Sequence, residues 1–290
     1  MHKDFISNLD YLNMVGIKFK KTKRVIDFIN TNDINRIKRY LPYNKNDWTS
    51  VNFDRIIKRI EFDAFLRMSI FNIASSVELT FKSILTKCIY EEYADNYIYN
   101  DVNFFINSAA QKEFKNKIKE IKNDYYKSPN DVFLKKYFTT NNVRIPISAI
   151  IQKLTFGEVI YEFINFNNKI QTKVANDFNA TGVSTFITNI TAAKNLRNAC
   201  CHNDVLNNKK YSAMPKFTNT IKTIINYNSI DHSKLFVQLY NLKLLCLDLK
   251  VWNKTIRSIS TQFKSYTKNK YIKPQQQFGF PFNWEELLKE

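Results

Sequence analysis

The chain has 290 residues, of which only 4 are glycine and 6 are proline. This scarcity argues against turn-rich all-β folds, and no glycine-rich loop has the spacing of a P-loop or a dinucleotide-binding turn. The sequence holds 44 Lys and Arg against 26 Asp and Glu, a formal net charge of +18. Such a charge favours a polyanion as partner, and a merely solvated basic surface is the alternative explanation.

Cysteine and histidine are too few and too scattered for ordinary zinc spacing. The four cysteines form no CxxC pair and there are three histidines, so no metal and no other cofactor is expected. Cys200 and Cys201 are interpreted as packing residues rather than as catalytic thiols. The first ten residues contain no apolar run, and no later stretch of about 18 residues is uninterruptedly apolar. We therefore expect a reduced, cytoplasmic protein with no membrane partner.

The first third of the chain predicts short helices followed by one long helix. Residues 1–48 predict two short N-terminal helices, the second capped by an Asn or Asp and ending before Pro42. Residues 53–93 predict a long core helix, because apolar residues from Ile56 to Cys88 recur at intervals of three and four. Residues 94–145 predict an inserted, lysine-rich lobe at the periphery, with helices near 111–122 and after Pro129.

The rest of the chain, residues 146–262, predicts further core helices. These cover 147–154, 159–166 and 183–202, and two more fall within 217–262, the second with an apolar stripe at Leu235, Leu239, Leu242, Leu245, Cys246 and Leu249. Residues 263–290 predict a C-terminal strap held down by Phe280 and Trp284. No internal repeat or linker divides the chain, so we expect one all-α domain over residues 1–290 with an inserted helical lobe.

The segment from Asn195 to His202 carries the candidate catalytic residues, Arg197, Asn198 and His202. At about 100° per residue, a helical wheel gathers polar side chains on one face and small or apolar ones opposite. The polar face holds Lys194, Arg197, Asn198, Cys201 and His202, and the opposite face holds Ala193, Leu196, Ala199 and Cys200. A plainer interpretation of the short motif alone is that His202 caps the helix C-terminus.

The polar face becomes apolar one and two turns earlier, at Ile190, Ile187 and Val183. Two interpretations are equally weighted. This face packs against a second copy of the chain beside a shared polar pocket, or the helix is simply buried at its start.

These residue types suit cleavage of RNA without a metal ion, because RNA supplies its own nucleophile, the 2′-hydroxyl. An imidazole titrates near working pH, so His202 fits the proton transfers. The guanidinium of Arg197 fits the charge that develops on phosphorus, and Asn198 can orient the phosphate or the imidazole. One histidine does not easily act as both base and acid, so a homodimer with two facing motifs is expected.

Several other residues have a functional and a structural interpretation. Glu78, a lone acid on the long helix, favours a salt bridge, for example with Arg67, over a role at the site. His232 favours a helix start. The expected RNA-binding residues are the lysines near the motif and in the tail, namely Lys194, Lys209, Lys210, Lys268 and Lys270.

Five segments in order resemble the Abi-like (AbiD/AbiF-type) abortive-infection proteins, a branch of the HEPN superfamily. Residues 34–41 are similar to the early IN-Y-R-L-Y segment, and residues 62–67 with 77–79 to the F-D-x-x-L-R…I-E helix. Residues 154–158 resemble the L-T/S-F-G turn, 196–202 the L-R-N-x-C-A-H motif, and 278–284 the terminal G-F-P-x-x-W. The sequence departs from the family at Cys201, where alanine is usual, and after His202, where the Arg-Leu-Trp-Asn run is absent.

The resemblance implies an all-helical, HEPN-type bundle with additional helices and a metal-independent endoribonuclease site at the Arg-x4-His motif. It also implies a composite site between two HEPN units, a role in stopping phage, kinship with the RNases of type VI CRISPR systems, and a small regulatory RNA as a plausible partner. The expected function is thus an anti-phage endoribonuclease. The alternatives are a non-catalytic RNA-binding module and, more weakly, an adaptor that binds a protein through its 183–190 face.

Overall fold

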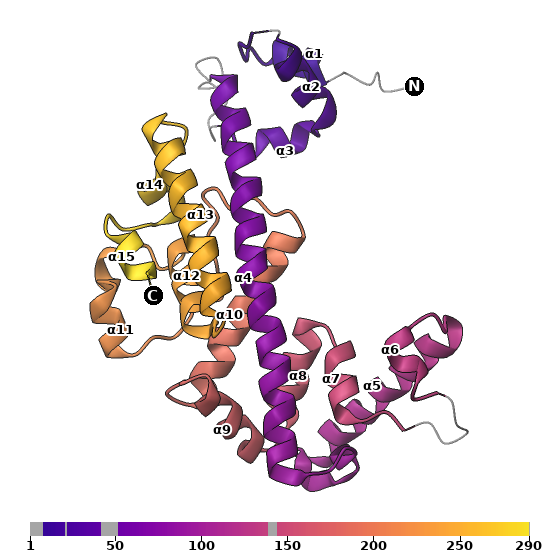
Figure 1. Cartoon of the computed structure of the whole chain (residues 1–290). Helices are drawn as coiled ribbons and strands as arrows, with labels where there is room; N and C mark the ends of the chain where they lie inside the picture. Colours follow the sequence, from indigo (N-terminus) through magenta and orange to yellow (C-terminus); the bar gives the residue numbers. More distant parts are fainter. Residues whose placement is uncertain (1–7, 21, 42–51, 139–143, 290) are drawn as a thin grey trace.

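Helices make up the described part of the chain, which in this computed structural model covers residues 8–20, 22–41, 52–138 and 144–289 (Figure 1). Within these ranges no β-strand occurs, and only an isolated antiparallel bridge joins Phe105 to Phe166. The prediction of an all-α fold is confirmed. None of the described helices is long and apolar enough to cross a membrane.

One long helix, α4 (Phe53–Tyr93), runs through the molecule, and its bounds are those predicted. Its 41 residues span about 60 Å at 1.5 Å per residue. The side chain of Asn52 caps its first turn by accepting a hydrogen bond from the backbone N–H of Arg55, and the helix ends at Ala94, whose φ is 50°. Most of the apolar residues of α4 are buried, and other helices pack along it on both sides, which makes it the scaffold of the fold (Figure 1).

The N-terminal helices pack on the first turns of α4 and form a second, smaller core there. They are α1 (Asn8–Met14), α2 (Lys23–Thr31) and α3 (Ile34–Lys38), so the prediction of two helices missed α1. As predicted, an acid starts the α3 helix, because the side chain of Asp33 accepts from the N–H groups of Asn35 and Arg36. The expected stop at Pro42 and the terminal His2 lie outside the described residues.

The lysine-rich segment is less peripheral than the sequence predicts. It contains the short 3-10 turns η2 (Ile98–Asn100) and η3 (Val102–Phe104) and the helices α5 (Ser108–Lys127) and α6 (Val132–Lys135). Phe104 and Phe114 are fully buried in the main core, where both contact the ring of Phe166. Aromatic residues between charged ones thus anchor the segment, although lysines dominate its composition.

Four helices follow the lobe: α7 (Ile147–Lys153), α8 (Phe156–Asn165), α9 (Asn168–Asp177) and α10 (Val183–Cys201). Helix α9 was not predicted from the sequence. Helix α10 packs against α4, α8, α9 and α12. Ile190 is fully buried in the core of its own chain, and Ile187 and Val183 pack against that core. The expectation that Ile190 faces a second copy is therefore wrong, and the interpretation of a helix buried at its start holds for this residue.

The C-terminal part forms α11 (Asn219–Ile224), the turn η4 (Tyr227–Ser229), α12 (Leu235–Leu245) and α13 (Leu249–Lys268). The predicted apolar stripe from Leu235 to Leu249 is wrong at its end. Asp248 caps a new helix by accepting from the N–H groups of Lys250 and Val251, so the chain turns after Cys246. Leu249 is consequently 52% exposed.

The C-terminal strap folds back over α13 through α14 (Pro274–Phe278) and α15 (Trp284–Leu288). The rings of Phe280 and Trp284 are buried against Phe263, which confirms their predicted anchoring role. Gly279 ends α14 at a φ of 74°, and a Cβ there would lie 2.5 Å from the Cβ of Lys234. Both the dihedral and the close approach require glycine at this turn.

Candidate functional site

The motif histidine lies where α10 ends, in a turn that its own sequence specifies. His202 is the C-cap residue, and its N–H donates to the carbonyl of Asn198 at 2.9 Å. Asn203 follows with a φ of 57°, the left-handed region that asparagine tolerates. The N–H of Asp204 then donates to the carbonyl of Ala199 at 2.9 Å, which completes a Schellman motif. The imidazole is therefore presented to solvent at a fixed helix end.

The wheel prediction of two faces on α10 is largely confirmed. Ala193, Leu196 and Cys200 are buried, whereas the side chains of the polar face are partly or fully exposed. Burial raises the pKa of the Cys200 thiol to about 12, which is unsuitable for a thiolate nucleophile. Cys201 is exposed, so its interpretation as a packing residue is wrong.

His202 and Asn198 line an open cavity of about 340 Å³ beside the end of α10. Lys209 and Lys210, two of the predicted RNA-binding lysines, line the same cavity, together with Tyr211. The loop after the motif thus turns back and places positive charge next to the imidazole. Asp204 also lines the cavity and pairs with Lys209 at 2.7 Å, so the two lysines outnumber the one acid and Lys210 supplies the excess positive charge.

Arg197 does not line this cavity and instead turns toward α4. One of its terminal nitrogens lies 3.4 Å from Oε2 of Glu78, and the other donates to the side-chain oxygen of Asn198 at 3.3 Å. Its guanidinium lies 5.4 Å from the centre of the Phe71 ring. Asn198 therefore lies between Arg197 and His202, since it accepts a hydrogen bond from Arg197 and also lines the cavity of His202.

Glu78 is held between two cations, and neither is the one predicted. Besides Arg197, it pairs with Lys82 at 3.1 Å one turn further along α4, and its side chain is only 12% exposed. Arg67 pairs with Asp63 instead, so the suggested Glu78–Arg67 bridge is wrong. The pairing with Lys82 was not predicted, although its spacing of four residues from Glu78 is typical of an ion pair on a helix.

The turn at residues 154–158 meets the same cluster. The ammonium of Lys82 donates to the carbonyl of Leu154 at 2.6 Å. Thr155 then starts α8 with a capping box, in which its hydroxyl accepts from the N–H of Glu158. A Cβ placed on Gly157 would lie 3.7 Å from Cδ of Lys194, so the stem of that lysine runs along this turn. Three of the segments that resemble the family therefore converge on the ion pair of Arg197.

A second buried network fixes the loop that follows His202. The carboxylate of Asp63, which has no exposed surface, accepts from the Tyr40 hydroxyl at 2.8 Å and pairs with Arg67. It also accepts from the backbone N–H groups of Leu206 and Asn207, at 3.1 and 2.8 Å to Oδ1. Burial raises the pKa of Asp63, and the surrounding donors oppose that rise.

The remaining predicted residues lie elsewhere. Lys194 lies on α10 one turn before Asn198, next to the motif. Lys268 and Lys270 are exposed at the end of α13 and do not line the cavity of His202. His232 precedes α12, as predicted for a residue at a helix start, and its ring stacks on Tyr227 with centroids 3.6 Å apart. The structure thus brings together the motif, Lys194, Lys209 and Lys210.

Comparison with known proteins places this chain in a family. The family model described as Abi-like protein matches residues 23–208. The chain belongs to the Abi-like protein family. The match includes Tyr40, Asp63, Glu78 and the whole Arg-x4-His motif, and it leaves out the terminal segment 278–284. No curated protein and no solved structure matches the chain.

The Asp63 network predicts a large loss of stability when its charge is removed. Asp63→Asn leaves Arg67 buried without its counterion, so we expect it to lower the free energy of unfolding by about 3–5 kcal/mol. Tyr40→Phe removes one hydrogen bond to a charged group and is expected to cost about 1.5–3 kcal/mol. Urea denaturation of each variant measures both effects.

The matched control is Asp54→Asn, the same chemical change at an exposed position of the same helix. It is expected to change stability by about 0.5 kcal/mol or less. Equal losses in Asp63→Asn and Asp54→Asn would show that the network does not stabilise the fold.

Proposed function

We propose that this protein is an abortive-infection protein of the HEPN type that cleaves RNA without a metal ion. The observation that carries the proposal is the placement of His202 at a fixed helix end, beside a basic cavity and one turn from Asn198 and Arg197. Membership in the Abi-like family supports the role in abortive infection. RNA supplies the nucleophile itself, so the protein has to supply only the proton transfers and the stabilisation of charge on the phosphate.

In this mechanism His202 moves the proton. The imidazole takes the proton from the 2′-hydroxyl or gives one to the departing 5′-oxygen. Asn198 orients the scissile phosphate from within the same cavity, and the amide contact to Arg197 couples the two halves of the motif. Lys209 and Lys210 hold the flanking phosphates by charge, and Lys194, Lys268 and Lys270 extend the basic surface for the rest of the RNA.

Arg197 stabilises the charge that develops on phosphorus, and Glu78 is its positioning residue. Glu78, whose side chain is only 12% exposed, holds the guanidinium of Arg197 in one orientation. Lys82 pairs with the same carboxylate and keeps it in place. The Nε of Arg197 is buried and has no hydrogen-bond partner within the described residues.

The second proton-transfer group comes from a second copy of the chain in this proposal. Ile190, one residue of the face first expected for the dimer, is buried in the core of its own chain and does not take part in the contact between copies. The exposed apolar residues Met68 and Leu79 on α4 offer a replacement, because they are 75% and 62% exposed. Met68 lies about one turn before Phe71 and Leu79 about two turns after it, and the Phe71 ring lies under the guanidinium of Arg197. Two copies that meet there bring their motifs toward one another.

Expression of the wild-type protein beside His202→Ala tests the proposed function. The wild type is expected to produce RNA fragments in the host and to arrest growth, and His202→Ala is expected to do neither, because the proton transfer is lost. Sequencing of the fragment ends from both cultures measures the effect. Identical fragment patterns would overturn the nuclease proposal, and RNA that co-purifies intact with both proteins would favour the non-catalytic RNA-binding module.

Glu78→Gln tests the positioning role, because it preserves shape and removes the charge that holds Arg197. We expect kcat to fall about tenfold, which raises the activation barrier of the enzyme–RNA complex by about 1.4 kcal/mol. KM is expected to fall as well, since an anion that competes with RNA phosphate is gone. Steady-state cleavage of a fluorescent RNA measures both constants.

Glu61→Gln is the matched control, because Glu61 lies on the same helix in exposed ion pairs with Arg24 and Lys58. It is expected to leave both constants unchanged, and Glu78→Asp is expected to recover part of the lost kcat. A Glu78→Gln enzyme whose KM and kcat stay at wild-type values contradicts the positioning role.

A further inference from the structure

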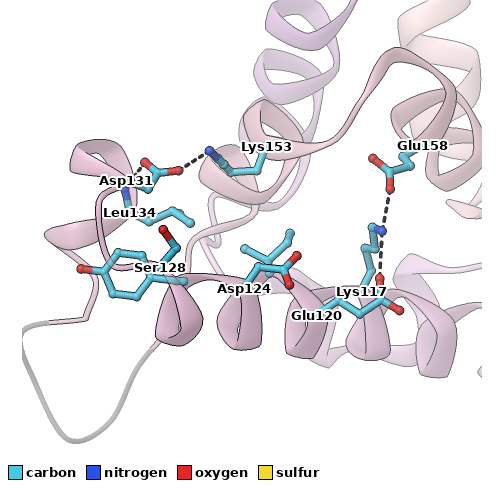
Figure 2. A pocket seen from close by; sticks show the side chains of 10 residues that line it. Lys117, Glu120, Asp124, Ser128, Asp131, Leu134, Lys153 and Glu158 are labelled. Carbon is cyan, nitrogen blue, oxygen red and sulfur yellow. Dashed lines mark hydrogen bonds and ion pairs between the residues drawn. The ribbon is translucent and has the colours of Figure 1, made fainter.

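One region of this basic protein is acidic. Between α5 and the turns and helices of α6, α7 and α8 lie two adjoining hollows of about 280 and 440 Å³, the first drawn in Figure 2. Both hollows share Lys117, Glu120 and Glu158, so we treat them as one feature, the acidic groove. Its lining holds six carboxylates and two lysines: Glu113, Glu120, Asp124, Asp131, Glu158 and Glu162, with Lys117 and Lys153.

The two lysines account for only part of this negative charge. Lys117 pairs with Glu120 at 2.9 Å and with Glu158 at 2.5 Å, and Lys153 pairs with Asp131 (Figure 2). No ion pair within the described residues reaches Asp124, which Figure 2 shows along the α5 side of the hollow. The groove therefore carries a net negative charge on a chain whose formal charge is +18.

Glu162 is the most unusual member of the groove. It lines the hollow, is only 4% exposed, and its Oε2 atom is buried without a hydrogen-bond partner. Burial, reinforced by the nearby charge of Glu113, raises its pKa to about 7. A buried carboxylate without a partner is unfavourable, and a cation that enters the hollow would relieve that penalty.

The arrangement of the carboxylates decides what kind of cation fits. A metal ion needs several ligands that converge on one point, and among the described residues no three His, Cys, Asp or Glu side chains do so. Here the acids are instead spread along α5 from Glu113 to Asp124, over about three helical turns. Ile121 and Leu134 add apolar surface to the wall between the charges.

We propose that the acidic groove binds a linear aliphatic polyamine, with one ammonium group placed at Glu162 and Glu113. The methylene segments of such a molecule separate its charges, so it matches carboxylates that are spaced along a groove with apolar patches. The chain as a whole has a formal net charge of +18, which disfavours general, unspecific binding of a polycation.

Isothermal titration with spermidine tests the site. The full-length protein is first freed of nucleic acid in high salt and checked by its ultraviolet absorbance ratio, because RNA itself binds polyamines. At constant ionic strength, the wild type is expected to show saturable one-site binding. Glu162→Gln is expected to weaken that binding by at least about tenfold, and Glu113→Gln to weaken it as well.

The controls separate a specific site from general charge effects. Glu162→Gln removes a buried charge without changing shape, so we expect it to be at least as thermally stable as the wild type. Glu286→Gln, the same change at an exposed residue of α15, is expected to leave spermidine binding unaltered. Mg²⁺ at the same ionic strength is expected to produce no saturable heat. Absence of saturable spermidine binding, equal affinity in Glu162→Gln, or equal binding of Mg²⁺ would each overturn the proposal.

Discussion

The carboxylate of Asp63 is the interaction on which the rest of the site depends. It is fully buried on α4 and accepts from Tyr40 and from the backbone of Leu206 and Asn207, two distant parts of the chain, and it pairs with Arg67 one turn along α4. Arg67 in turn donates to the carbonyl of Asp204. A buried charge is stable only when it has partners, and the loop that immediately follows the motif histidine supplies two of them. Asp63 therefore fixes the position of that loop.

Glu78 repeats the same principle about four turns further along α4. It fixes the motif arginine on one side, and Lys82 joins it to the carbonyl of Leu154 on the other. One continuous helix thus holds both ends of the Arg-x4-His motif through two acids. Several of the scattered segments that resemble the family therefore meet on α4, since residues 34–41 supply Tyr40 to Asp63 and residues 196–202 supply Arg197 to Glu78.

Local signals made much of the fold predictable. The bounds of α4 follow from its apolar spacing, Asp33 marks the start of α3, and the buried face of the motif helix follows from its wheel. The lysine-rich segment is less peripheral than predicted because a few aromatic side chains, such as Phe114, are buried in the core although the composition of the segment is charged. The α12 stripe failed because a polar cap at Asp248 interrupts an otherwise regular apolar pattern.

The candidate site was predictable only in part, for reasons of tertiary contact. The motif residues and the nearby lysines can be identified from sequence, but the pairing of Glu78 with Arg197 joins residues on two helices and leaves no local pattern. Ile190 illustrates the same limit, because an apolar residue at the right helical spacing fits a dimer face and a protomer core equally well. Only the packing of α10 against four other helices distinguishes them.

Cleavage of a defined synthetic RNA in excess EDTA tests most directly whether the motif uses the nucleophile of RNA itself. Mass spectrometry of the products of the purified wild-type protein is predicted to find 2′,3′-cyclic phosphate ends, and the all-2′-deoxy analogue of the same sequence is predicted to stay intact. Loss of cleavage on chelation, or cuts in the deoxy analogue, would contradict a metal-independent mechanism built on Arg197, Asn198 and His202.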